Sequence, residues 1–89
     1  MAHIPHKELQ KLLDDAGQKI EVGATYYHYK HPIDQPYTVL NLAILEATEE
    51  PAVIYKAQYE GEITFIRPIS EWLDMVEWEG KQVPRFQKK

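Results

Sequence analysis

Residues 51–68 read PAVIYKAQYEGEITFIRP, and this stretch decides the fold class. β-branched and aromatic residues recur through 51–59 and again through 62–68, polar residues take every second position in YKAQY (55–59), and Glu60 and Gly61 separate the two runs. Alternation with a period of two, in β-branched and aromatic residues, predicts strands. A connection this short that contains glycine predicts a tight turn. The stretch therefore predicts a β-hairpin within a mainly β domain.

The same alternation begins at Val22 and recurs toward the end of the chain. It covers ATYYHYKH (24–31), PYTVLNLAIL (36–45) and MVEWEGKQVPRF (75–86), the last of which predicts two brief strands around Glu79-Gly80. Before them, PISEWLD (68–74) predicts one short helical turn with Ser70 as its N-cap. This order predicts a small SH3-like β-barrel. An OB-type barrel is the alternative, but it needs a fuller helix between its third and fourth strands.

The chain begins with a predicted helix from Pro5 to Ala16. Leu9, Leu12, Leu13 and Ala16 form one apolar stripe, and Gly17 is placed to end the helix in a left-handed conformation. The stripe covers an open end of the domain or pairs with a second copy, so we expect a monomer or a helix-mediated homodimer. The expected organisation is a helix and connection in 1–21, the barrel in 22–86 and a loose tail in 87–89.

Composition excludes several classes of protein. With 89 residues the chain has room for one domain, and it contains no cysteine, which rules out disulfides, thiolate nucleophiles and cysteine-based zinc sites. The N-terminal residues do not have the pattern of a secretory signal, and no stretch approaches the ~20 apolar residues that span a bilayer. The net charge of −4 argues against general attraction to nucleic acid or anionic lipid. We therefore expect a cytoplasmic protein with no membrane partner.

The heptapeptide TYYHYKH (25–31) is the main candidate for a site. In an extended strand its side chains alternate, so Tyr27 and Tyr29 lie on one side and His28 and Lys30 on the other. Exposed rings of this density favour a docking or stacking platform, although a core or rim role explains tyrosines equally well. Elsewhere, Tyr55 and Tyr59 share a face of their strand. Arg67 either pairs with an acid such as Glu77 or anchors an anionic ligand.

Catalytic and metal-binding patterns are weak. There is no GxSxG turn, the four glycines are scattered, and the paired carboxylates fall at a helix end and in a turn. The histidine pairs His3/His6 and His28/His31 do not match a known metal-site spacing. We expect no enzymatic activity, no metal and no cofactor.

Several motifs, taken in order, resemble the bacterial domain-of-unknown-function family 1653 (DUF1653). They are YYHYK (26–30), YTVL (37–40), PAVIYKAQY (51–59), IRP (66–68) and VEWEGKQVPRF (76–86), within a resemblance from about Gly23 to Phe86. The resemblance implies an SH3-type barrel and no particular activity. It also implies that the family's signature positions are Tyr27, His28, Lys30, Tyr37, Tyr55, Tyr59, Arg67, Pro68, Gly80, Arg85 and Phe86. The chain departs from the family in a longer loop, HPIDQPY (31–37), and in YEGE (59–62), which lacks the usual aspartate after the glycine.

Together these observations predict a non-catalytic binding module. Its partner would be a protein segment or a small anionic or aromatic ligand, and the candidate ligand-binding residues are Tyr27, His28, Tyr29, Lys30, Tyr55, Tyr59 and Arg67. The alternative is a nucleic-acid-associated domain, against which the acidic balance counts. Its candidate residues are Lys81, Arg85, Phe86, Lys88 and Lys89.

Overall fold

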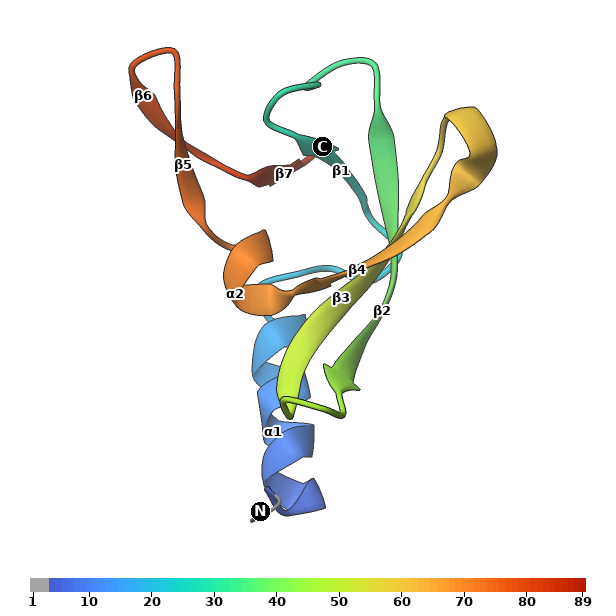
Figure 1. Cartoon of the computed structure of the whole chain (residues 1–89), viewed down its shortest axis with the longest axis vertical. Helices are drawn as coiled ribbons and strands as arrows, with labels where there is room; N and C mark the ends of the chain where they lie inside the picture. Colours follow the sequence, from blue (N-terminus) through green and yellow to red (C-terminus); the bar gives the residue numbers. More distant parts are fainter. Residues whose placement is uncertain (1–3) are drawn as a thin grey trace.

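A computed structural model describes residues 4–89 and confirms the mainly β class (Figure 1). It confirms the added N-terminal helix and the short helical turn before the last strands. Over these residues the elements are α1 (His6–Gly17), β1 (Thr25–His28), β2 (Pro36–Leu45), β3 (Glu50–Ala57), the 3₁₀ turn η1 (Glu60–Glu62), β4 (Thr64–Pro68), α2 (Ile69–Trp72), β5 (Met75–Trp78), β6 (Lys81–Pro84) and β7 (Phe86–Lys88).

Five strands form one antiparallel sheet in the order β4-β3-β2-β1-β7, and β5 pairs with β6 in a separate hairpin. Figure 1 shows this hairpin standing away from α1 at the opposite end of the molecule. The strand pairing does not run around to a closed cylinder, because β4 and β7 are the two edges of the five-stranded sheet. The predicted barrel is therefore open between these edges at the level of backbone hydrogen bonds.

Both predicted hairpins are present. In the first, Tyr55 of β3 lies opposite Phe65 of β4, but the connection is longer than a two-residue turn and contains η1. In the second, Glu79 and Gly80 join β5 to β6 with positive φ angles of 52° and 79°. Two consecutive positive φ angles define the turn type that matches the twist of paired strands, and glycine adopts such angles without strain.

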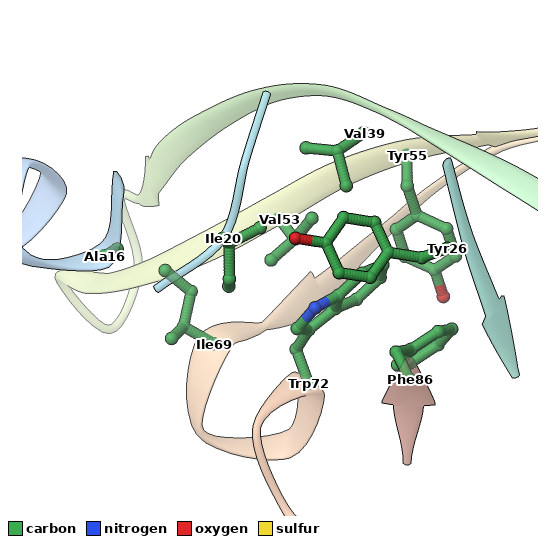
Figure 2. Packing of buried hydrophobic residues seen from close by; sticks show 9 residues of the cluster. All are labelled: Ala16, Ile20, Tyr26, Val39, Val53, Tyr55, Ile69, Trp72 and Phe86. Atoms are coloured by element: carbon green, nitrogen blue, oxygen red, sulfur yellow. The ribbon is translucent and has the colours of Figure 1, made fainter. Parts of the chain in front are cut away.

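The core is centred on stacked aromatic rings (Figure 2). The ring of Trp72 in α2 lies 3.8 Å from that of Phe86 in β7, with 6° between the ring planes. Tyr26 and Tyr55 meet Trp72 edge-on at 5.4 and 4.9 Å. Through these contacts α2 packs against β1, β3 and β7 of the sheet. The cluster of buried residues is Ala16, Ile20, Tyr26, Val39, Val53, Tyr55, Ile69, Trp72 and Phe86.

Helix α1 packs against β2 and β3 of its own chain. Ala16 is buried and Leu9 and Leu13 are half-buried, whereas Leu12 is exposed. The apolar stripe thus covers one end of the sheet, and the homodimer stays an untested prediction. The predicted left-handed end is wrong: Gly17 lies within the helix, and the chain leaves it through a right-handed residue, Gln18 (φ −81°, ψ −18°).

Two further predictions are wrong. The tail at 87–89 is not loose, because Gln87 and Lys88 belong to β7, which pairs with β1. The Lys88 ammonium also lies 2.9 Å from the Glu21 carboxylate. Ser70 is not the N-cap of α2: the cap position is Pro68, and Ser70 lies inside the helix. Among residues 4–89, no helix has the length and apolarity required to cross a membrane.

The ring stack predicts a difference between two phenylalanines. Phe86 is 6% exposed and contacts several rings, whereas Phe65 is 40% exposed. Phe86→Leu should lower the free energy of unfolding by about 1–2 kcal/mol, because leucine keeps much of the apolar volume but loses the ring contacts. The same change at Phe65 should stay within about 0.5 kcal/mol. Urea titrations followed by tryptophan fluorescence measure both, and equal losses would contradict the assigned core.

Candidate ligand-binding hollow

Several of the predicted site residues converge on one open concavity, which we call the inner hollow. It has a volume of about 330 Å³ and is lined by His28, Lys30, His31, Gln35, Tyr37, Tyr55, Phe65, Arg67 and Phe86. Of the seven predicted ligand-binding residues, His28, Lys30, Tyr55 and Arg67 are in this set. The hollow lies on the inner face of the sheet and reaches the surface where the core rings end.

The alternation of side chains along β3 and β4 places several of these residues at the hollow. Phe65 and Arg67 are two residues apart in β4 and therefore share a face, and Phe65 lies opposite Tyr55 of β3. At the other side of the hollow, β1 ends at His28, and the chain turns back through a hydrogen bond from the His31 amide to the His28 carbonyl (2.9 Å). This turn brings His31 to the same hollow as His28, although strict alternation would have separated them.

Arg67 is the central cation of the hollow. Its Cζ lies 5.5 Å from the centroid of the Phe86 ring, and its Nε donates to the Tyr55 hydroxyl at 3.4 Å. One terminal nitrogen lies 3.3 Å from the Glu71 carboxylate. The predicted pairing with an acid is therefore confirmed, but the acid is Glu71, one helical turn further along the chain, and not Glu77.

His28 lies between the ring of Phe86, 5.2 Å away and edge-on, and the ring of Tyr29. Its Nδ1 accepts a hydrogen bond from the Lys30 amide at 3.2 Å, so the neutral ring carries its proton on Nε2. Burial is the largest cause that lowers the pKa of His28 from 6.5 to about 4, and the nearby positive charges of Arg67, Arg85, Lys30 and His31 add to it.

One lining residue of the hollow, Tyr37, is hydrogen-bonded to a second tyrosine outside the lining set. The Tyr37 hydroxyl hydrogen-bonds to that of Tyr59. Burial, followed by this hydrogen bond, raises the pKa of Tyr37 well above its usual value, so Tyr37 remains a neutral phenol. Tyr59 thus positions a lining residue without lining the hollow itself.

Tyr27 and Tyr29 lie elsewhere. Together with His28, they line a second concavity of about 510 Å³, the outer groove, between β1 and the β5–β6 hairpin. The Tyr29 ring meets that of Trp78 edge-on at 5.3 Å. The predicted separation of Tyr27 and Tyr29 from His28 and Lys30 is wrong in part, because His28 lines both concavities and its ring lies 4.5 Å from that of Tyr29. The strand ends at His28, and the Lys30 ammonium lies 5.8 Å from the Tyr29 ring.

Three of the five residues of the alternative, nucleic-acid set, Arg85, Phe86 and Lys88, are engaged within the chain. Phe86 is buried in the core and cannot act as an exposed stacking ring, which corrects that prediction. Arg85 donates to the Glu71 carbonyl at 2.9 Å and lies 3.8 Å from the Asp74 carboxylate. Lys88 pairs with Glu21. Lys81 lies in the hairpin and Lys89 at the end of the chain.

Within residues 4–89, no three side chains of the types that bind metals gather in one place. His3, one of the histidines considered from the sequence, lies outside the described residues. The lining set contains an arginine, a lysine, two histidines and four aromatic rings. This combination suits recognition of an anionic group attached to an apolar body.

Phe65, His31 and Gln35 were not predicted from the sequence as lining residues. Tyr37 was named only as a family signature position, and Phe86 as a signature position and as a residue of the nucleic-acid alternative. For Phe65 a signal was present, because it stands two residues before Arg67 and must share its face. For His31 and Gln35 there was none, because their positions depend on the turn that follows β1.

The lowered pKa of His28 predicts how stability changes with pH. The unfolded chain takes up a proton at His28 near pH 6.5, but the folded chain does so only near pH 4. Folding stability is therefore lost as the pH falls from about 6.5 to about 4, and His28→Gln should remove this part of the loss. Urea midpoints of both proteins between pH 4 and 7 measure the difference, which cancels the shared titration of the carboxylates. Parallel curves would contradict the assignment.

Comparison with known proteins gives a family and no named relative. Neither a curated protein nor a solved structure matches this chain. One family model, described as Protein of unknown function (DUF1653), matches residues 24–88 and so covers β1 through β7. The helix α1 lies outside the match. On this basis the chain belongs to the DUF1653 family.

Proposed function

We propose that this protein is a non-catalytic binding module whose inner hollow takes a ligand with a carboxylate and an adjoining apolar group. The observation that carries this proposal is the convergence of Arg67 and Lys30 on a ring-lined hollow in a chain whose net charge is −4. In an acidic protein, cations gathered over apolar rings favour an anion at that place.

Arg67 supplies the anion-binding group. Its side chain is 28% exposed, so it is partly withdrawn from water yet open to a ligand. Its present acidic partner, Glu71, is 54% exposed and contacts one terminal nitrogen. A surface pair of this kind contributes little, and a ligand carboxylate that also gains apolar contacts can share or displace it.

The rings supply the apolar part of the site. Tyr55 and Phe86 are buried except where they border the hollow, and Phe65 is the more exposed ring at its edge. His28 adds a neutral ring with a donor at Nε2, and therefore contributes a hydrogen bond without a charge. A flat or aliphatic group attached to a carboxylate would contact both kinds of surface at once.

The proposal includes two expectations that rest on the sequence. The protein acts in the cytoplasm of a bacterial cell, and its fold is of the SH3 type. The nucleic-acid alternative is less well supported, because Arg85 and Lys88 are engaged in contacts within the chain. Its distinctive outcome would be oligonucleotide binding that weakens steeply with salt.

A matched pair of small probes tests the proposal. 3-Phenylpropionate and 3-phenylpropanol differ in the carboxylate, and an affinity on the order of 1 mM is expected for an acid of this size. The alcohol should bind at least about tenfold more weakly, because a hydrogen bond to a charged group contributes roughly 1.5–3 kcal/mol. Amide chemical-shift titrations measure both affinities and show whether the shifts map to the inner hollow.

Arg67→Gln should weaken binding of the acid about tenfold and leave the alcohol unchanged. The matched control is Lys56→Gln, which removes the same charge from β3 on the face opposite Tyr55, where Lys56 pairs with Glu62. If Arg67→Gln and Lys56→Gln bind the acid equally well, the hollow is not the site.

A further inference from the structure

Among residues 4–89, no strand pairs with the outer edge of β4, which lies next to the inner hollow. The Ala57 amide donates to the Ile63 carbonyl at 2.9 Å, so the backbone groups of Ile63 face β3. In an antiparallel ladder this direction alternates along the strand. The backbone groups of Phe65 and Arg67 therefore also face β3, whereas those of Thr64 and Ile66 point outward at the edge of the sheet.

This edge is unusually apolar. The exposed fractions are 56% for Ile63, 40% for Phe65 and 58% for Ile66. Proteins commonly protect an exposed edge with charges, prolines or bulges, because an open edge pairs with other chains. In β4, Arg67 and Pro68 lie at one end only. The middle of the strand thus offers both hydrogen-bonding groups and apolar surface to a partner.

The edge and the hollow are connected through the same two side chains. Phe65 and Arg67 line the inner hollow, and a strand beside β4 would place its own side chains opposite them. We propose that the natural ligand is an extended peptide segment that pairs antiparallel with β4 and places a carboxylate beside Arg67. This inference rests on the proposed function, because it assigns the carboxylate to a peptide.

The side chains of β4 determine which residues the paired peptide should contain. An acidic residue stands opposite Arg67, a β-branched residue opposite Ile66 and an aromatic residue opposite Phe65, which reads Glu-Val-Tyr in the antiparallel direction. A second copy of β4 fits this description poorly. In the register that engages Thr64 and Ile66 of both copies, Arg67 would stand opposite Ile63 and would find no carboxylate.

Two N-methylated peptides test the pairing. The parent is a capped peptide with Glu-Val-Tyr at its centre. Its valine exchanges hydrogen bonds with Ile66, and its tyrosine amide points away from β4. Methylation of the valine nitrogen should weaken binding at least about tenfold. Methylation of the tyrosine nitrogen is the matched control and should bind like the parent.

Thr64→Pro tests the protein side. It removes an outward donor, and the preceding residue, Ile63, already has the extended backbone (φ −69°, ψ 139°) that proline requires. The variant should bind the parent peptide at least about tenfold more weakly and bind 3-phenylpropionate unchanged. The second result separates loss of strand pairing from loss of the anion site.

Other outcomes would overturn the inference. If the N-methyl-valine peptide binds as tightly as the parent, the peptide docks without a backbone ladder. If light scattering shows a mass that doubles with concentration for the wild type but not for Thr64→Pro, the edge serves a second copy of the chain. If 3-phenylpropionate does not bind but the methylation pattern holds, strand pairing stands and the proposed anion site fails.

Discussion

The face-to-face contact between Trp72 and Phe86 is the interaction on which the rest of the structure depends. In the part of the chain that the structure describes, β4 and β7 are the two unpaired edges of the sheet, and the sequence has no cysteine that could join them by a disulfide. Trp72 follows directly from β4 through α2, and Phe86 begins β7. Their stacked rings therefore join the two edges by side-chain packing where no backbone ladder does so.

The same cluster forms the floor of the inner hollow. The Phe86 ring stacks on Trp72 in the core, and it also contacts Arg67 and His28, which line the hollow. The hollow is thus the place where the aromatic core meets the surface. Tyr55 and Phe86 belong both to the buried core and to the lining of the hollow. Because the hollow exists only in the folded chain, a ligand that binds there should raise the free energy of unfolding.

Much of the local structure could be predicted from the sequence. The alternation in PYTVLNLAIL matched β2, Pro36–Leu45, and the helical turn predicted before the last strands is α2, Ile69–Trp72. The edges of the sheet could not be predicted, because alternation does not specify which strands pair. The partner of Arg67 was missed although the predicted helical turn over 68–74 places Glu71 four residues after Arg67, which is the spacing of the observed pair. The tail was misjudged because its polar residues are stabilised by pairing with β1.

The most direct test of this account is a measurement of proton distances around the Phe86 ring by nuclear Overhauser spectroscopy. The contacts of Phe86 predict cross-peaks from its ring to the Trp72 indole and to the Arg67 side chain, with the Arg67 protons shifted upfield by the ring current. Cross-peaks to Trp72 without any to Arg67 would show that the aromatic core forms but that Arg67 does not lie beside Phe86 in the hollow. The absence of both would contradict the aromatic closure of the sheet.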